Sequence, residues 1–242
     1  MSGTNNWELR TRLLVGEKNI KKLHQSHVLV VGLGGVGACA AEMLCRSGIG
    51  HLTIVDGDSF QLSYLNRQLP SLNSNIGQKK ATVLENRLHD INPKIVLNVI
   101  DEYISKDEMQ NLFTEKYDYV IDAIDTLSPK IYLIYNSLKK GIPLVSSMGA
   151  GGKYDPALVR IADISESHTC NLARMLRKRL HKLGIYEGFK VVFSAETIDP
   201  ETIELTEEEL NKKSVVGTIS YMPSVFGCYC ASAVIRDLID TK

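Results

Sequence analysis

Short apolar runs alternate with stretches of helical periodicity along much of the chain. The apolar runs predict strands at His27–Val31, Leu52–Asp56, Ile95–Ile100, Tyr119–Asp122 and Pro143–Ser147. The helical patterns between them predict helices at Gly35–Ser47, Gln78–Ile91, Ser105–Phe113 and Pro129–Lys140. This alternation is typical of α/β proteins, so we expect a Rossmann-like, doubly wound and mostly parallel sheet with helices on both faces.

Start and stop signals support the helix that follows Asp125. Ser128 and Pro129 suit the N-cap and the first position of a helix, and Gly141 suits its end. Further along the chain, the pattern predicts two more strands and a last helix, at Leu158–Ile164, Lys190–Ser194 and about Pro223–Asp240.

No Pro-, Gly- or Ser-rich linker divides the chain. We therefore expect a single domain over residues 1–242, with a core at 1–148 and a C-terminal elaboration at 149–242. The 44% hydrophobic and 23% charged residues are ordinary for a globular protein. Because the net charge is zero, a nucleic-acid partner would need a local basic patch.

The five cysteines are odd in number and form no CxxC pair, which favours a reducing compartment. The N-terminal residues hold no apolar stretch of the kind found in secretory signals, so we expect a cytoplasmic protein. The uncharged segment Ser214–Ile235 is long enough for a membrane helix, but its glycines, proline and Ser/Thr residues favour a buried strand, turn and helix. Membrane association through 214–235 is the alternative, and we expect no stable insertion.

Two charged segments follow the core. Basic residues recur with helical spacing on one side of a leucine-lined pattern, at Arg174, Arg177, Lys178, His181 and Lys182. This stripe is interpreted either as a solvated face or as a face that contacts phosphates. The acidic run from Glu196 to Glu209 is expected to be a solvated loop.

The most informative segment runs from His27 to Asp58, where a strand enters the glycine-rich turn GLGGVG and a small-residue helix follows. Gly32 permits the tight turn, Gly34 leaves room for a phosphate, and Gly37 lets the helix approach the strand; Gly35 lies between them. The second strand ends at Asp56, about 20 residues on, where an acid can bind a ribose. The segment therefore predicts a nucleotide site.

The charged residues that follow indicate which class of nucleotide the site binds, a dinucleotide or a reacting triphosphate. Arg67, Lys79 and Asp125 come after predicted strands, at the sheet edge where open α/β sheets bind ligands. A dinucleotide does not require them together, so an NAD-dependent dehydrogenase explains less of the sequence. A reacting triphosphate needs fixed cations and usually a metal. Arg67 and Lys79 would supply the cations, and Asp125, beside Asp122, would hold Mg²⁺.

The motifs GLGGVG, IVDGD, LNRQ, IGxxKA and DAID follow one another as in the ubiquitin-activating-type ATP-dependent adenylyltransferases, which this chain resembles. The resemblance implies that Asp56 binds the ATP ribose, that Arg67 and Lys79 contact the phosphates, and that Asp125 is linked to Mg²⁺. Asp58 and Asn66 join the glycines as expected nucleotide-binding residues. Arg12 resembles an arginine that reaches the neighbouring protomer's γ-phosphate, which implies a homodimer.

The segments GAGGKYDPALVRIADI and GTISYMPSVFGCYC resemble the tRNA threonylcarbamoyladenosine dehydratase branch of this superfamily. That branch uses ATP to activate the threonyl carboxylate at tRNA position 37, and the neighbouring carbamoyl group then closes a ring with loss of water. The resemblance implies a nucleotide-binding core at 1–148, a substrate side at 149–242 and tRNA as a partner. Under it, Arg174, Arg177, Lys178 and Lys182 are candidate tRNA contacts.

Three further expectations and two alternatives remain open. A monovalent cation (Na⁺ or K⁺) is a second candidate ion, and a protein of a cysteine-desulfurase system is a candidate partner. Cys170, Cys228 and Cys230 are interpreted as structural rather than as acyl acceptors. The alternatives are an adenylyltransferase that activates a ubiquitin-like sulfur carrier and a non-catalytic sulfur-relay or scaffold protein. The sulfur-carrier branch commonly has two CxxC pairs, and this chain has none.

Overall fold

The fold is built on one seven-stranded sheet. The computed structural model describes residues 7–104, 108–205 and 214–239. The strand order is β3-β2-β1-β4-β5-β7-β6, and all neighbours are parallel except β6 and β7. The strands are β1 (His27–Val31), β2 (His51–Val55), β3 (Val96–Ile100), β4 (Tyr119–Asp122), β5 (Leu144–Ser147), β6 (Val159–Asp163) and β7 (Lys190–Ser194). The expected α/β fold is confirmed.

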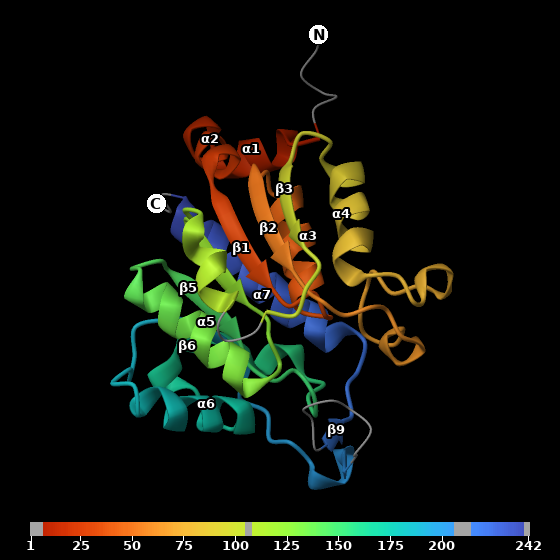
Figure 1. The fold of residues 1–242 in the computed structure, drawn as a ribbon, viewed down its shortest axis with the longest axis vertical. Helices are drawn as coiled ribbons and strands as arrows, with labels where there is room; N and C mark the ends of the chain where they lie inside the picture. Colours follow the sequence, from red (N-terminus) through yellow and green to blue (C-terminus); the bar gives the residue numbers. More distant parts are fainter. Residues whose placement is uncertain (1–6, 105–107, 206–213, 240–242) are drawn as a thin grey trace.

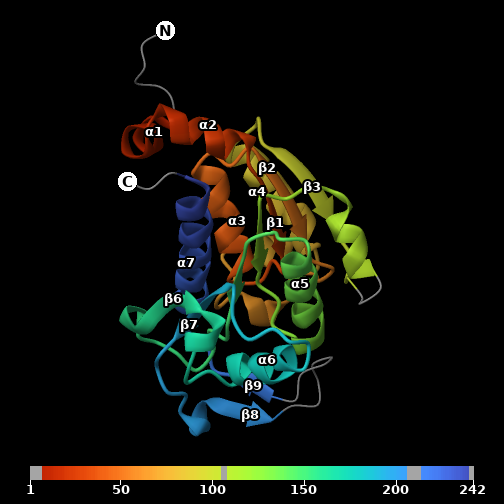
Figure 2. The same cartoon turned by 90° about the vertical axis from the view of Figure 1, so that its left-hand side faces the viewer.

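Helices cover both faces of the sheet (Figures 1 and 2). On one face lie α3 (Gly37–Arg46), α4 (Lys80–Ile91) and α7 (Tyr221–Leu238), and on the other lie α5 (Leu127–Lys139), α6 (Asn171–His181) and the short 3-10 helix η3 (Glu108–Thr114). In β1, Val28 and Val30 pack on the first face and Leu29 and Val31 on the second. This double burial explains why the strands are continuous apolar runs.

The remaining elements lie at the two ends of the sheet. The helices α1 (Leu9–Val15) and α2 (Glu17–Gln25) precede β1 and lie at the end where β1 begins (Figure 1). The strands β8 (Ile203–Leu205) and β9 (Ser214–Val216) form a separate antiparallel pair at the opposite end (Figure 2). The helix α7 then returns along the sheet and packs beside α3.

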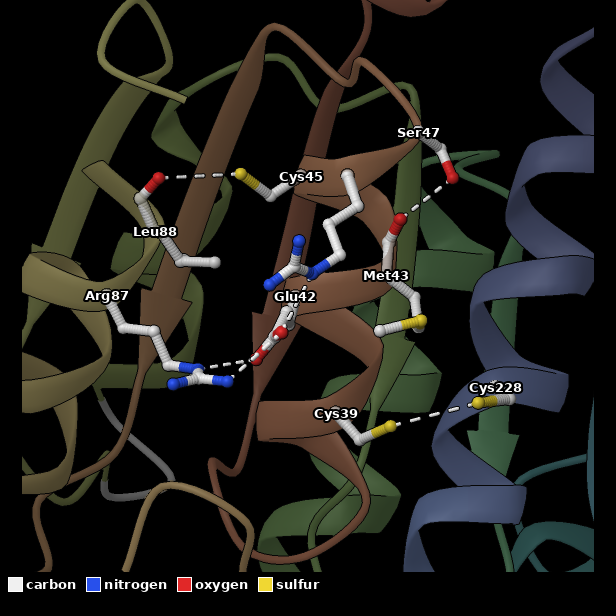
Figure 3. Close-up of polar contacts among 9 residues, drawn as sticks. Cys39, Glu42, Met43, Cys45, Ser47, Arg87, Leu88 and Cys228 are labelled. Atoms are coloured by element: carbon white, nitrogen blue, oxygen red, sulfur yellow. Dashed lines mark hydrogen bonds and ion pairs between the residues drawn. The ribbon is translucent and has the colours of Figure 1, made fainter. Parts of the chain in front are cut away.

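The contact between α3 and α7 leaves little room. A Cβ on Gly227 would lie 2.5 Å from the Val36 carbonyl oxygen and 2.8 Å from the Cys39 Cβ. The sulfur atoms of Cys39 and Cys228 are 3.9 Å apart across the same contact (Figure 3). On its other side, α3 is tied to α4 by Glu42, whose carboxylate accepts a 2.6 Å hydrogen bond from Arg87 Nε.

Three local predictions need correction. Residues 108–113 of the expected helix Ser105–Phe113 belong to the 3-10 helix η3, and 105–107 lie outside the described residues. Thr126, not Ser128, occupies the N-cap of α5, so Pro129 lies within its first turn. Residues 203–205 of the acidic run form β8 instead of a solvated loop, and 206–209 lie outside the described residues. The Glu196 carboxylate accepts hydrogen bonds from the Tyr154 and Asp155 amides.

The segment 214–235 forms β9, a turn and most of α7, as expected. The strand and turn are not buried as expected, since Val215 and Ile219 are 43% and 44% exposed. Within the described ranges, no helix has both the length and the apolar character needed to cross a membrane.

The α3–α7 contact generates a stability prediction. Gly227→Ala would force the two helices apart, because backbone and Cβ atoms already occupy the space that the methyl group needs. We expect a decrease of about 1–3 kcal/mol in the free energy of unfolding, typical of overpacking. Chemical denaturation measures it, and Arg236→Ala, at an exposed position of the same helix, is the control. A Gly227→Ala protein as stable as the parent would contradict this packing.

Candidate active site

A cavity of about 550 Å³ opens where β1, β2, β4 and β5 end. This is the sheet edge at which open α/β folds bind ligands. Its lining includes seven of the expected site residues, namely Gly32, Gly34, Gly35, Asp56, Asp58, Arg67 and Asp125. Leu172, Thr218 and Pro223 from the C-terminal part of the chain complete the wall.

The glycine loop is shaped by close backbone contacts. Gly32 has a φ of +90°, and a Cβ there would lie 2.7 Å from the Ala123 carbonyl oxygen. A Cβ on Gly37 would lie 1.7 Å from the Gly32 carbonyl oxygen, so no side chain is possible at that position. At Gly34 the nearest atom would be 3.8 Å away, which leaves open space beside the cavity. The N-terminus of α3 therefore reaches the cavity with room for an anion.

Asp56 ends β2 beside this loop. Its carboxylate accepts hydrogen bonds from the backbone amides of Leu33, at 2.6 Å, and Asp58, at 2.8 Å. These bonds fix the acid at the cavity wall and connect the end of β2 to the glycine loop. The position suits the hydroxyl groups of a ribose.

Asp58 belongs to a compact charged group at the cavity. Its carboxylate lies 2.6 Å from Lys80 Nζ and accepts a 3.0 Å hydrogen bond from the Tyr64 hydroxyl. Burial alone would raise the pKa of Asp58, but the Lys80 ammonium and the Tyr64 hydroxyl outweigh it and hold the pKa below its usual value. The Lys80 ammonium also lies 4.4 Å from the centre of the Tyr64 ring, a cation–π distance.

The structure separates the two adjacent lysines. Lys80 is 5% exposed and lines the cavity, whereas Lys79, the expected phosphate contact, is not part of the lining. The Lys79 ammonium donates a 3.0 Å hydrogen bond to the Gly57 carbonyl and lies 3.2 Å from the Asp101 carboxylate. Lys80 is also the lysine directly before Ala81, where the motif IGxxKA has it.

Arg67 lines the cavity, and its guanidinium donates to the Ser63 carbonyl and to the Asn66 side-chain oxygen, both at 2.8 Å. Asn66 itself is not in the lining; its side-chain amide donates a 3.0 Å hydrogen bond to the carbonyl of Thr218, which does line the cavity. Gln68, which the sequence analysis did not assign to the site, is buried in the wall, and its side-chain oxygen has no hydrogen-bond partner among the described residues. An unpaired buried acceptor of this kind is suited to a ligand donor.

Asp122, the last residue of β4, and Asp125, in the loop that follows, have different environments. Asp122 is fully buried, accepts a 2.6 Å bond from the Ser146 hydroxyl and lies 2.9 Å from Lys130 Nζ. Asp125 instead lies on the cavity wall. Within the described ranges, no group of three or more His, Cys, Asp or Glu side chains is placed to hold a metal. Asp125 would therefore hold an ion together with ligand oxygens, as Mg²⁺ usually is.

Arg12 and the cavity lie at opposite ends of the sheet. Arg12 is on α1, where its Nε is 3.5 Å from the Glu17 carboxylate, and it is not part of the lining. The helix α1 lies where β1 begins, while the cavity opens where β1 ends (Figure 1). A single chain does not bring Arg12 to the expected nucleotide.

The basic stripe lies on α6, whose early residue Leu172 lines the cavity. Arg174, Lys178 and Lys182 are exposed, which leaves them accessible to a partner. Arg177 has a structural contact instead, because its guanidinium bonds to the Ser167 carbonyl at 2.6 Å. Three of the four candidate tRNA contacts are therefore exposed.

The described cysteines give no evidence of a reactive thiol beside the cavity. Burial raises the pKa of Cys39 to about 12 and that of Cys45 to about 11, and it also raises the pKa of Cys230. These thiols are protonated at neutral pH and are poor nucleophiles. None of the five cysteines lines the cavity.

The fold and this site define an adenylate-forming, nucleotide-binding protein, and comparison with known proteins gives its family. The ThiF family matches residues 8–242, and the chain belongs to this family.

Similar proteins share most of the chain. It is 38% identical to tRNA threonylcarbamoyladenosine dehydratase of Bacillus subtilis (strain 168), over 95% of this chain and 93% of that one. The Escherichia coli (strain K12) protein of the same name is also 38% identical, over 78% of this chain and 73% of that one. The structure of the E. coli dehydratase, TcdA, in complex with ATP has a TM-score of 0.87 at 33% identity and covers 98% of this chain and 97% of that one.

Proposed function

We propose that this chain catalyses the ATP-dependent, cyclising dehydration of threonylcarbamoyladenosine at position 37 of tRNA. The observation that carries the proposal is the cavity at the strand ends, where the glycine loop, Asp56, Arg67 and Asp125 meet. Relatives named as this dehydratase match nearly the whole chain, and a TcdA structure with the same fold contains ATP. Both support an enzyme of the adenylate-forming type. The sulfur-carrier and scaffold alternatives are not favoured.

The cavity residues support a two-step reaction. The threonyl carboxylate attacks the α-phosphate of ATP, pyrophosphate leaves, and an acyl adenylate forms. The glycine-loop amides and the cations at the cavity stabilise the negative charge that develops on the phosphates. The carbamoyl group, tethered beside the activated carbon, then attacks it and displaces AMP. Because attacker and target belong to one nucleoside, proximity lowers the barrier of this step.

Mg²⁺ is part of the proposal. Asp125 would hold it at the cavity wall, with phosphate oxygens completing the coordination. Bound there, it would neutralise charge on the phosphates. The monovalent cation and the cysteine-desulfurase partner stay predictions that no contact among the described residues addresses.

For the phosphate lysine, we propose Lys80 in place of Lys79. Lys80 lies on the cavity wall and is already charge-paired with Asp58, whereas Lys79 points to Asp101. Arriving phosphates would share the Lys80 ammonium with Asp58. The two adjacent lysines therefore provide a matched pair of variants.

We expect Arg67→Ala and Lys80→Met to lower the rate of ATP–pyrophosphate exchange, measured with substrate tRNA, about a hundred- to thousand-fold. Removal of one group that stabilises transition-state charge has an effect of this size. Lys79→Met should stay within a few-fold of the parent. Thermal melting confirms folding, because Lys80→Met also leaves the Asp58 carboxylate unpaired. The reverse ranking of the two lysine variants would restore Lys79 as the phosphate contact.

The function itself is tested by product mass. We expect incubation with ATP, Mg²⁺ and tRNA containing threonylcarbamoyladenosine to convert that nucleoside to a product lighter by one water. Arg67→Ala should leave the nucleoside intact, and so should the parent protein in a chelator if Mg²⁺ is required. A chain that adenylates a Gly-Gly-ended carrier protein and leaves the tRNA unchanged would contradict the proposal.

We propose that the exposed cations of α6 contact tRNA phosphates, since the helix starts at the cavity wall. Changing Arg174, Lys178 and Lys182 to Gln should weaken tRNA binding. The slope of log affinity against log salt concentration should also become less negative, by about 0.7–0.9 for each phosphate that the helix no longer neutralises. A control triple at exposed lysines elsewhere, Lys21, Lys94 and Lys139, should change neither. If both triple variants weaken tRNA binding equally, the effect comes from the protein's net charge, and a specific contact between α6 and tRNA is contradicted.

A homodimer would explain the position of Arg12. Within one chain, this residue and the cavity lie at opposite ends of the sheet. On the same helix, Leu13 is 77% exposed and Leu14 is 86% exposed. Adjacent apolar side chains that are exposed in one chain often mark a surface that a partner covers. We propose that α1 packs on a second copy and supplies Arg12 to its cavity. Sedimentation of a monomer at micromolar concentration would contradict the dimer.

A further inference from the structure

A buried ion pair lies directly behind the wall that carries Asp125. Lys130 on α5 and Asp122 at the end of β4 are both 0% exposed, and Lys130 Nζ lies 2.9 Å from the Asp122 carboxylate. Two opposite charges removed from water need excellent geometry to offset their desolvation. The role of this pair therefore follows from the loop that it contacts and not from its contribution to stability.

The pair fixes the backbone of one loop from both sides. Lys130 Nζ donates a 2.8 Å hydrogen bond to the Ile124 carbonyl, and the Ile124 amide donates one of 3.1 Å to the Asp122 carboxylate. The Ser146 hydroxyl on β5 holds the other carboxylate oxygen at 2.6 Å. These hydrogen bonds join the two charged groups to a neighbouring strand end and to this loop.

The loop held in this way is a wall of the nucleotide cavity. Ala123, Ile124, Asp125 and Thr126 all line the cavity. The loop also packs against the glycine loop, because the Ala123 carbonyl oxygen lies 2.7 Å from the position of a Cβ on Gly32. A shift of Ile124 would therefore move Asp125 relative to the phosphate-binding backbone.

We propose that Lys130 is a positioning residue, which through Asp122 and Ile124 holds Asp125 where it can bind the nucleotide's metal ion. Its side chain is 0% exposed and is not part of the cavity lining, so it would act on the nucleotide site only through the loop. The inference rests on the proposed function, in which Asp125 holds Mg²⁺. Groups that hold a metal ligand in place typically change metal affinity about ten- to a hundred-fold when removed.

The test compares nucleotide binding with and without metal. Lys130→Met leaves a buried carboxylate unpaired and can unfold, so the double variant Lys130→Met/Asp122→Asn is made beside it. The double variant has no charge at either position. Its asparagine side chain at position 122 still offers an oxygen and an amide group for hydrogen bonds with the Ile124 amide and the Ser146 hydroxyl. Lys139→Met, an exposed lysine on the same helix, is the control, and melting curves establish folding.

We expect the folded double variant to bind ADP without metal as the parent does, within two-fold, by titration calorimetry. The Mg²⁺ concentration that half-saturates metal-dependent ADP binding should rise about ten-fold or more. If Lys130 had only a structural role, ADP binding would weaken equally with and without Mg²⁺, and that result overturns the inference. Unchanged metal dependence also overturns it.

Asp125→Asn, measured in parallel, separates this inference from the proposed metal site. If Asp125→Asn raises the Mg²⁺ requirement and the double variant does not, only the positioning role of Lys130 is wrong. If Asp125→Asn has no effect, the proposed metal site fails and the inference fails with it.

Discussion

The contact between Gly32 and Gly37 is the constraint on which the site depends. A Cβ on Gly37 would lie 1.7 Å from the Gly32 carbonyl oxygen, so α3 must begin directly against the end of β1. This closeness directs the free amides and the positive end of the α3 dipole into the cavity. Pro223 and Gly227 then bring α7 against the same region, which explains how the C-terminal helix becomes part of the nucleotide wall.

The carboxylates of Asp56 and Asp58 have hydrogen-bond partners before any ligand binds. Asp56 is satisfied by two backbone amides, and Asp58 by Lys80 and Tyr64. The ion pair with Asp58 holds the Lys80 ammonium in place, and Lys80 is only 5% exposed. In its proposed role, Lys80 would offer this fixed cation to an arriving triphosphate. Preorganised groups of this kind need little rearrangement when charge develops in the transition state. The cavity therefore suits phosphoryl chemistry better than hydride transfer.

The second half of the chain contributes to both the sheet and the cavity. β7 pairs with β5 in the parallel sheet, and β6 closes the edge in the antiparallel direction. The loop after β5, the start of α6 and the segment before α7 reach the cavity through Gly149, Leu172 and Thr218. Basic α6 therefore starts at the cavity wall that a tRNA substrate would have to approach. This continuity joins the nucleotide site to the proposed tRNA surface.

The sequence by itself determined the architecture, because buried parallel strands must be apolar along their whole length and glycines are required where backbones touch. All seven strands of the main sheet and the glycine loop could be anticipated in this way. Asp56 and Arg67 also line the cavity, while their roles in nucleotide binding stay predictions. The start of α5 could not be anticipated: Thr126 rather than Ser128 is its N-cap, since the cap position depends on where the chain leaves β4.

Only the tertiary structure decided which way neighbouring side chains point. Lys79 and Lys80 are the same residue type, but Lys79 pairs with Ser59 in an isolated bridge and α4 begins at Lys80, so the two ammonium groups face different partners. Asp122 and Asp125 differ in the same way, one paired with Lys130 in the core and one on the cavity wall. Contacts between residues distant in sequence set these directions. For the lysines, the motif IGxxKA was the one local signal, because it has its lysine at Lys80.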